Sequence, residues 1–487
     1  MDAVGAPDAL AGGAAGHERL AELIPLALGT LAAGGTERDG AAPAGGPAAV
    51  AAALSGARPL VPAEGVGAER ALAELGTLFA AGSVDPAEPW CAAHLHCPPL
   101  AVAVAADVVA GALNPSMDSW DQAPVATELE REFVTEMARL CYPDEPAPDA
   151  VVTTGGTESN LLGLLLARER NPAVRPVCGA SAHHSVARAA WLLGLPAPVV
   201  VDCDDQRIRP AALETALGTA LDGAPAVVVA TAGTTDTGEI DPLPEVARIC
   251  RRHNARLHVD AAYGGLALCS PSLRSRLDGL GEADSIALDL HKFGWQPISA
   301  GLFVSRVASD LDALTVRAEY LNSEDDTEAG LPDVLGRSLR TSRRPDVFRM
   351  AVTMRALGVR GMGAMVEQCC RTAAEVAGLI DADPGLTLWG SPKLSTVLFR
   401  PAVADDITVP AANALVARIR RTLLEAGTAV VGRATIGGRI WLKLTFLHPH
   451  ATAADYSGLL GEILAVARAE MTPPAARAAS AEGAVTS

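Results

Sequence analysis

Aromatic residues are scarce in this 487-residue sequence, at 3% of the chain, and positive charge is outnumbered. Lys and Arg total 39 against 57 Asp and Glu, which gives a formal net charge of −18. Because an acidic surface repels phosphate backbones and anionic lipids, nucleic acids and membrane surfaces are disfavoured as partners. A small-molecule ligand agrees better with this charge balance.

Features of secreted and membrane proteins are also lacking. The nine cysteines include no CxxC pair, which favours reduced thiols over a disulfide framework. The N-terminal residues have neither a basic segment nor a compact apolar segment, so we expect no signal peptide. The most apolar stretch, residues 100–113, is too short to cross a bilayer and contains Asp107. The sequence therefore favours a cytoplasmic protein.

The composition is that of a globular protein, with 49% hydrophobic and 20% charged residues. From about residue 90 to 345, short apolar runs alternate with helical patterns. Such alternation predicts an α/β fold with a mostly parallel sheet covered by helices on both faces. The runs that we predict as strands are 150–153, 198–201, 226–230, 257–259, 285–288 and 302–304, and the clearest helical patterns are 158–170 and 243–254.

The segments that flank this region differ from it in composition and in hydrophobic pattern. Residues 1–89 are rich in Ala, Gly and Pro with short helical patterns, and we interpret them as an N-terminal helical arm. Residues 90–345 form the large domain, and residues 346–471 are predicted to form a smaller α+β domain. The tail at 472–487 has low complexity and is expected to be disordered.

A glycine-containing segment lies between the first predicted strand and the helical pattern at 158–170. It contains Gly155, Gly156 and Thr157, which suit anion binding because glycines let backbone N–H groups approach a ligand at a helix N-terminus. The segment lacks the lysine of a nucleotide P-loop, which disfavours a triphosphate. A phosphate site and a plain helix cap with turn glycines both remain open.

Two further residues stand at strand ends. Asp260 ends the apolar run at 257–259, where ligands bind in open α/β sheets, and a carboxylate there needs a cationic partner such as a cofactor's pyridinium nitrogen. A helix cap or an Asp–Arg pair is the alternative. Lys292 follows the run at 285–288 and is flanked by Phe293 and Trp295, so its amine loses its charge more easily and can form an imine.

The order of these segments, together with several longer motifs, resembles the group II pyridoxal-dependent amino-acid decarboxylases. This family includes DOPA, glutamate, histidine and 2,4-diaminobutyrate decarboxylases. The matching motifs are AHLHCPP (93–99), NPSMDSWDQAPVATELE (114–130), TTGGTESN (153–160), AHHSV (182–186), ATAGTTDTGEIDPL (230–243), HVDAAYGG (258–265), LHK (290–292) and AEYLN (318–322). The resemblance runs from about residue 90 to 361, and more weakly to about 447.

The resemblance implies the fold of fold-type I enzymes that use pyridoxal 5'-phosphate. That fold has a large, mostly parallel seven-stranded sheet domain, a smaller C-terminal α+β domain and an N-terminal helical arm. The resemblance also implies a homodimer. An N-terminal arm that has no core of its own agrees with this, because it needs a partner surface.

The family roles carry over by motif. His183 matches the histidine that stacks on the cofactor ring, Asp260 the partner of the ring nitrogen, and Ala262 the small residue packed under the ring. Lys292 matches the Schiff-base lysine, and His291 a neighbour of the phosphate.

The remaining cofactor positions are assigned in the same way. Gly155, Gly156 and Thr157 match the phosphate cup, and Thr235 falls near the position that contacts the phenolic oxygen. Many members have Asn near the phosphate where this chain has Asp289, so Asp289 is left out of the predicted phosphate site.

Tyr320 matches the tyrosine of a mobile loop that protonates the substrate carbon after carbon dioxide leaves. The catalytic set implied by the resemblance is therefore Lys292, Tyr320, His183 and Asp260. Relatives that release aldehydes with oxygen commonly lack this tyrosine, so Tyr320 favours simple amine formation. Oxidative decarboxylation of an unusual amino acid remains the main alternative.

The substrate pocket is predicted from the motif at 114–121, which is polar here but apolar in members that act on aromatic substrates. Asp118 in this segment suits a substrate with a distal amine, because a buried carboxylate needs a cation. Ser116 lies in the same segment, and His94 matches a histidine at the active-site entrance. The resemblance is nearest to 2,4-diaminobutyrate decarboxylases; an aromatic or acidic substrate, and a turn-capping role for Asp118, remain alternatives.

Two other interpretations were weighed. The spacing of Cys91, His94, His96 and Cys97 allows a structural zinc site, but these residues lie within a family motif and we expect no metal. A catalytically inactive relative that serves as a binding protein is disfavoured by the presence together of His183, Asp260, Lys292 and Tyr320.

Overall fold

The computed structural model describes residues 10–13, 15–221, 223–316, 318, 321 and 323–471. The chain divides into two units. One comprises residues 97–371 and 392–395, and the other comprises the described parts of residues 1–96, 372–391 and 396–487. This division groups the N-terminal segment with the C-terminal one, whereas the sequence favoured a separate arm at 1–89.

The larger unit is built on a seven-stranded sheet with the order β1-β9-β8-β7-β6-β2-β3. Only β9 runs antiparallel to its neighbours β1 and β8, and the other pairs are parallel. This confirms the predicted mostly parallel α/β sheet. The strands are β1 (Asp149–Thr153), β2 (Arg175–Gly179), β3 (Val199–Val201), β6 (Ala226–Thr231), β7 (Arg256–Asp260), β8 (Ser285–Asp289) and β9 (Gly301–Ser305), with a small ribbon of β4 (Cys203–Asp204) and β5 (Arg207–Ile208).

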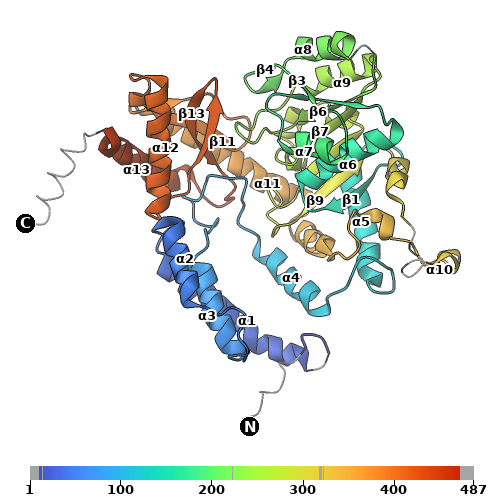
Figure 1. The fold of residues 1–487 in the computed structure, drawn as a ribbon, viewed down its shortest axis with the longest axis horizontal. Helices are drawn as coiled ribbons and strands as arrows, with labels where there is room; N and C mark the ends of the chain where they lie inside the picture. The colour runs from blue at the N-terminus through green and yellow to red at the C-terminus, as the bar shows by residue number, and fades with distance from the viewer. Residues whose placement is uncertain are drawn as a thin grey trace, which may run out of the picture. The chain divides into compact units, whose positions relative to one another are not determined.

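The central strands are buried because helices pack on the sheet. Every residue of β6, β8 and β9 is buried, as expected of strands covered on both faces. Helix α6 (Gly156–Arg170) lies against this sheet beside α7 (Ser185–Leu192), as Figure 1 shows. Leucines of α6 pack on Val151 and Phe303 in one cluster, and on Val227 and Val229 in another.

This unit contains further helices besides α6 and α7. The sequence did not predict α5, whose apolar face is interrupted by charged residues, nor β2, whose Arg175-Pro176 start obscures a strand pattern. The further helices of this unit are α4 (Ala101–Leu113), α5 (Pro124–Cys141), α8 (Pro210–Thr215), α9 (Leu243–Arg252) and α10 (Glu324–Glu328). Helix α11 (Asp346–Ala382) begins in this unit and ends in the other, with its helical geometry interrupted at Gly358 (φ 67°).

The second unit contains a four-stranded antiparallel sheet with the order β10-β11-β13-β12. Its core includes Phe399, Leu442 and Phe446 from this sheet region and Leu415 and Ile419 from a covering helix. The elements are β10 (Leu386–Leu388), β11 (Thr396–Pro401), β12 (Gly432–Ile436), β13 (Arg439–Thr445), α12 (Val409–Glu425) and α13 (Ala453–Met471), with α1 (Gly16–Arg38), α2 (Gly46–Gly56) and α3 (Ala68–Ala81) from the N-terminal segment. An α+β arrangement agrees with the prediction for the C-terminal part.

The nine cysteines all lie in the described part of the chain, where each is free and seven are buried. Burial raises the pKa of several of these thiols, for example that of Cys97 to about 12, so they stay protonated and unreactive. No helix in the described ranges is both long and apolar enough to cross a membrane.

Candidate active site

The candidate site lies at one edge of the large sheet. Strands β1, β7 and β8 run in the same direction, so their carboxyl ends meet there. Asp260 is the last residue of β7, and Asp289 is the last residue of β8. This is the edge at which open α/β sheets bind ligands.

The glycine segment after β1 forms a tight turn into α6. Gly155 has φ 142°, a conformation that favours glycine, and it precedes the first helical residue, Gly156. A methyl group added to Gly155 would lie 2.7 Å from His291 Cε1 and 3.4 Å from Asp289 Oδ1. The backbone N–H groups of the first turn of α6 have no partner within the helix. The turn therefore brings anion-binding groups next to the segment that carries Lys292.

Gly156 makes a second close approach, to the segment after β7. A methyl group on Gly156 would lie 2.9 Å from Ala262 Cβ, closer than real Cβ atoms come, and 3.5 Å from Asp289 Oδ2. Three segments that are far apart in the chain thus converge at the glycines. They are the turn at 154–157, the residues after β7 and the residues after β8.

Lys292 lies in the turn after β8 and keeps access to solvent. Its Nζ is 2.8 Å from Asp289 Oδ2, and His291 Nε2 is 3.4 Å from the same oxygen. The Lys292 side chain is 18% exposed, whereas Phe293 and Trp295 behind it are fully buried. Asp289 Oδ1 is buried and has no hydrogen-bond partner among the described residues. The pair therefore leaves an amine accessible at the sheet edge and one carboxylate oxygen unsatisfied.

Asp260 is a buried carboxylate, 6% exposed, that is held by neutral donors. Its Oδ1 accepts a hydrogen bond from the Ala262 backbone N–H (3.1 Å), and its Oδ2 accepts one from Asn160 Nδ2 (2.7 Å). No ion pair joins Asp260 to a Lys, Arg or His side chain in the described part of the chain. Because a buried charge without a cation is costly, the site suits a ligand that carries one.

His183 lies near these groups, just before α7. Burial lowers the pKa of its imidazole, and the Asp260 carboxylate partly offsets this, while Lys292 lowers the pKa further. Its Nδ1 is 2.8 Å from Ser185 Oγ, which in turn accepts a hydrogen bond from Asn160 Nδ2 (2.8 Å). The imidazole is therefore neutral at pH 7 and connected to Asp260 through two side chains.

Asn160 and Ser185 were missed in the sequence analysis as functional residues. Both lie inside motifs that carried the family resemblance, but a buried polar side chain at such a position has no signal of its own. Their contacts, between residues 25 and 100 positions apart, follow from the packing of α6 on β7 and α7.

Thr235 is exposed in the loop that follows β6. Asp241 closes the base of this loop, where it accepts hydrogen bonds from the backbone N–H groups of Ile208 (2.6 Å) and Thr231 (2.7 Å). Burial raises the pKa of Asp241 to about 6. Asp241 thus fixes the loop that presents Thr235.

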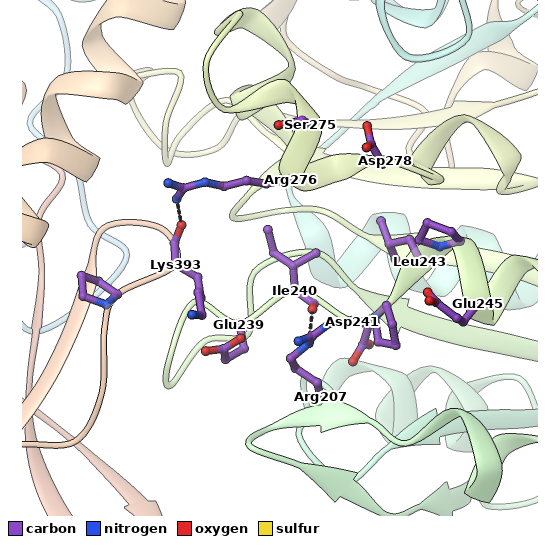
Figure 2. Close-up of a pocket in the computed structure, with 13 residues that line it drawn as sticks. Arg207, Glu239, Ile240, Asp241, Leu243, Glu245, Ser275, Arg276, Asp278 and Lys393 are labelled. Carbon is purple, nitrogen blue, oxygen red and sulfur yellow. Dashed lines mark hydrogen bonds between the residues drawn. The ribbon is translucent and has the colours of Figure 1, made fainter.

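Asp241 also lines a cavity of about 500 Å³, which Figure 2 shows together with Arg207, Arg276 and Lys393. Arg207 donates to the Ile240 carbonyl oxygen at 2.8 Å, and Arg276 donates to that of Lys393. Two of the three cationic side chains are therefore engaged by backbone carbonyls. The cavity contains none of the residues assigned to the cofactor.

The residues predicted for the substrate have different surroundings. Asp118 is 6% exposed, and its oxygens accept hydrogen bonds from Gln122 Nε2 (2.8 Å) and Ser342 Oγ (3.4 Å). Ser116 Oγ is buried and has no hydrogen-bond partner in the described ranges. His94 belongs to the other unit, where it is exposed. Partial shielding of its ring from solvent, together with the charge of Lys443, lowers its pKa.

Tyr320 lies outside the described residues, so its assignment stays a prediction. Downstream of Tyr320, the described residues include the short, exposed helix α10. Within the described ranges, no three His, Cys, Asp or Glu side chains are grouped as a metal site requires.

An accessible amine, an anion-binding turn and a buried carboxylate held by neutral donors, on one edge of a mostly parallel sheet, are typical of a cofactor-dependent α/β enzyme. Residues 74–402 match the family model described as the pyridoxal-dependent decarboxylase conserved domain. The chain belongs to the pyridoxal-dependent decarboxylase family, and it is an amino-acid decarboxylase whose cofactor is pyridoxal 5'-phosphate.

Individual relatives agree with this assignment. The chain is 39% identical over 424 residues to an L-2,4-diaminobutyrate decarboxylase of Rhizobium meliloti, with 84% of each chain covered. It is 34% identical over 435 residues to one from Acinetobacter baumannii, with 83% and 85% covered. Among solved structures, the chain matches the crystal structure of the glutamate decarboxylase domain of a diaminobutyrate-pyruvate transaminase and L-2,4-diaminobutyrate decarboxylase from Vibrio parahaemolyticus. The TM-score is 0.82 and the sequence identity is 30%, and the match covers 94% of this chain and 97% of the other.

The residues at the sheet edge fit this cofactor. The glycine turn leaves room that a single Cβ would fill, and N–H groups there suit a phosphate. Asp260 offers a buried carboxylate without a cation, which suits a protonated ring nitrogen. Lys292 offers an accessible amine that contacts Asp289, the carboxylate next to the glycine turn.

Proposed function

We propose that this enzyme decarboxylates a diamino acid, with L-2,4-diaminobutyrate as the first candidate, and releases the corresponding amine and carbon dioxide. The observation that carries the substrate class is Asp118. Its carboxylate is buried and receives hydrogen bonds from neutral groups only, and no ion pair joins it to a cation in the described ranges. The distal ammonium of a diamino acid would supply the missing charge. The names of the two curated relatives support the same class.

The proposed cofactor site uses residues from three segments. Gly155, Gly156 and Thr157 would hold the phosphate at the N-terminus of α6, with His291 as its neighbour. Lys292 would hold the cofactor covalently through Nζ.

Ala262 would pack under the ring, and Thr235 would contact the phenolic oxygen. The bound cofactor would supply an electron sink for the bond between Cα and the departing carboxylate. Asp260 contributes by holding the proton on the ring nitrogen.

The proton steps fall to other side chains of this chain. Neutral His183 would pack over the ring and exclude water from the reacting carboxylate. Tyr320 would donate its hydroxyl proton to Cα after carbon dioxide has left, and solvent would return a proton to the tyrosine oxygen. His94 and Ser116 are proposed to orient the substrate.

Tyr320 separates amine formation from oxidative decarboxylation. In a Tyr320→Phe variant the proton donor is lost, so we expect amine production to fall and aldehyde, hydrogen peroxide and oxygen consumption to rise. Product analysis and an oxygen electrode measure both. Unchanged amine output would remove Tyr320 from the mechanism, and oxygen consumption by the unaltered enzyme would favour the oxidative alternative.

We also propose a homodimer in the cytoplasm. The described N-terminal helices expose large apolar side chains, among them Leu28 (61% exposed), Leu31 (59%) and Phe79 (75%), which a second copy would cover. Nine unpaired cysteines agree with a reducing compartment.

A substrate screen tests the proposed activity. Purified holoenzyme is incubated with L-2,4-diaminobutyrate, ornithine, lysine, glutamate and DOPA, and carbon dioxide release and amine formation are measured. We expect the highest kcat/KM for L-2,4-diaminobutyrate. A preference for glutamate or DOPA would overturn the substrate assignment while leaving the family assignment intact.

A further inference from the structure

A group of polar side chains is buried where α6 meets β7 and β8. Asn160 (0% exposed), His258 (1%) and Ser285 (4%) lie next to Asp260. Asn160 Oδ1 is 2.9 Å from His258 Nε2, and His258 Nδ1 is 2.8 Å from Ser285 Oγ. Buried polar side chains are normally hydrogen-bonded, as these are. A fully hydrogen-bonded polar network makes the positions of its members rigid, so this one can orient Asp260.

The orientation of the Asn160 amide is fixed by its neighbours. Its Nδ2 lies 2.7 Å from Asp260 Oδ2, and an ionised carboxylate only accepts hydrogen bonds, so the nitrogen must face Asp260. The carbonyl Oδ1 then faces His258 and only accepts. His258 Nε2 must therefore carry the proton of that hydrogen bond.

His258 is neutral in this environment. Burial lowers its pKa to about 4, which leaves one proton on the ring at pH 7. Because that proton is on Nε2, Nδ1 accepts from the Ser285 hydroxyl. The hydrogen bonds thus run in one direction, from Ser285 through His258 and Asn160 to Asp260.

A second branch leads from Asn160 to His183. The other Nδ2 proton of Asn160 is donated to Ser185 Oγ at 2.8 Å. His183 Nδ1 lies 2.8 Å from that oxygen and 3.3 Å from the Ser185 backbone nitrogen. Since a backbone N–H only donates, His183 Nδ1 is an acceptor, and its proton is on Nε2.

Gly163 gives an independent indication that the His258 ring is held in place. This residue lies inside α6, where glycine destabilises a helix by about 1 kcal/mol relative to alanine. A methyl group at Gly163 would lie 2.7 Å from His258 Nδ1. On another side, the Phe303 ring lies 6.0 Å from the imidazole with an interplanar angle of 22°.

We propose that Asn160, held by His258, is a positioning residue that orients the Asp260 carboxylate and, through Ser185, supports the tautomer of His183. The two donors that Asp260 receives are neutral, so its charge stays available for the cationic ring nitrogen. The same amide holds Ser185 Oγ beside His183 Nδ1, and together with the Ser185 backbone N–H this leaves His183 with its proton on Nε2. This inference rests on the proposed function, because Asp260 and His183 act through the cofactor only if they face it.

The tautomers are measurable in the protein without cofactor. We use ¹⁵N-histidine-labelled apoprotein and assign the signals with His183→Gln and His258→Gln variants. We expect both imidazoles to be neutral and protonated on Nε2 at pH 7. A His258 protonated on both nitrogens, or a His183 protonated on Nδ1, would overturn the proposal without any measurement of activity.

Variants then test the dependence on Asn160. In Asn160→Leu we expect the His183 signals to lose the single-tautomer pattern and the affinity for pyridoxal phosphate to fall by about tenfold to a hundredfold, the range for one hydrogen bond to a charged group. Ser159→Ala is the control, because Ser159 is equally buried on α6 but bonds to Thr153 and to the Leu302 carbonyl. An equal effect of Ser159→Ala would reduce Asn160 to a structural role.

Rescue by a conservative change completes the test. In His258→Gln the side-chain amide can still donate to Asn160 Oδ1, whereas in His258→Leu it cannot. We expect pyridoxal phosphate to bind about as tightly to His258→Gln as to the unaltered protein, and at least about tenfold more weakly to His258→Leu. Equal affinities of the two variants would contradict the proposal. Apoprotein with the expected tautomers but no cofactor binding would refute the proposed function and leave the hydrogen-bond chain standing.

Discussion

At the scale of single residues, three of the buried carboxylates in the large unit differ in their partners. Asp289 pairs with Lys292, whereas Asp260 and Asp118 receive hydrogen bonds from neutral donors. A buried charge that lacks a cation in the protein is stabilised when a ligand brings one. We therefore propose that Asp260 pairs with the cofactor's ring nitrogen and that Asp118 pairs with the distal substrate ammonium.

The Asp118 assignment predicts the effect of removing its charge. In Asp118→Asn we expect KM for a diamino acid to rise about tenfold or more, which corresponds to about 1.4 kcal/mol of binding free energy, with little change in kcat. Steady-state kinetics with L-2,4-diaminobutyrate measure this. Asp121→Asn is the matched control, because Asp121 lies in the same turn, is exposed and accepts a hydrogen bond from Ser119. Equal kinetics of Asp118→Asn and the unaltered enzyme would support the turn-capping alternative.

The sequence indicated as candidate site residues those that follow predicted strands. Asp260 and Lys292 follow apolar runs, and the structure places both at the same sheet edge. Sequence position did not indicate Asn160, Ser185 or His258 as parts of the site. Their hydrogen bonds depend on which face of α6 meets β7, and the residues that they join are 25 to 100 positions apart.

At the scale of elements, the site depends on how closely the start of α6 approaches the residues after β7. Gly156 has no room for a side chain because Ala262 lies against it. The glycines thus serve both the anion-binding turn and the packing of two segments that follow different strands.

This close approach predicts a result for a pair of variants. In Gly156→Ala the added methyl group meets Ala262 Cβ at 2.9 Å. We expect overpacking of about 1–3 kcal/mol, seen as a roughly fivefold to hundredfold weaker affinity for pyridoxal phosphate. Fluorescence titration of the apoprotein measures it.

Two further variants make this prediction specific. Ala262→Gly in the Gly156→Ala background removes the opposing methyl group, so we expect most of the affinity to return. Gly111→Ala on α4 is the control, since a methyl group there meets no atom within 4 Å. If the double variant bound no better than Gly156→Ala, the contact with Ala262 would not be the cause.

Elements with a strong apolar pattern were predictable from sequence, and weakly patterned ones were not. The six predicted strands all correspond to strands of the large sheet, within a few residues at each end. Strand β2 was missed because it begins with Arg175-Pro176, and α5 because charged residues interrupt its buried face.

At the scale of the whole molecule, the proposed homodimer accounts for apolar side chains that the described N-terminal helices expose. Sedimentation equilibrium should give about twice the chain mass of 49.8 kDa. A Leu28→Glu/Phe79→Glu variant places charges on this surface, so we expect it to shift toward the monomer. Leu379→Glu, on α11, is the control for a charge at another exposed leucine. A monomeric mass for the unaltered protein would contradict the proposal.

The chain contains only three lysines, Lys292, Lys393 and Lys443, which makes the central claim directly measurable. Holoprotein is reduced with borohydride, digested and analysed by mass spectrometry to locate the pyridoxyl group. The account predicts the group on Lys292, its retention in Lys393→Arg and its loss in Lys292→Arg. A pyridoxyl group on Lys393 or Lys443, or none on any lysine of cofactor-loaded protein, would contradict it.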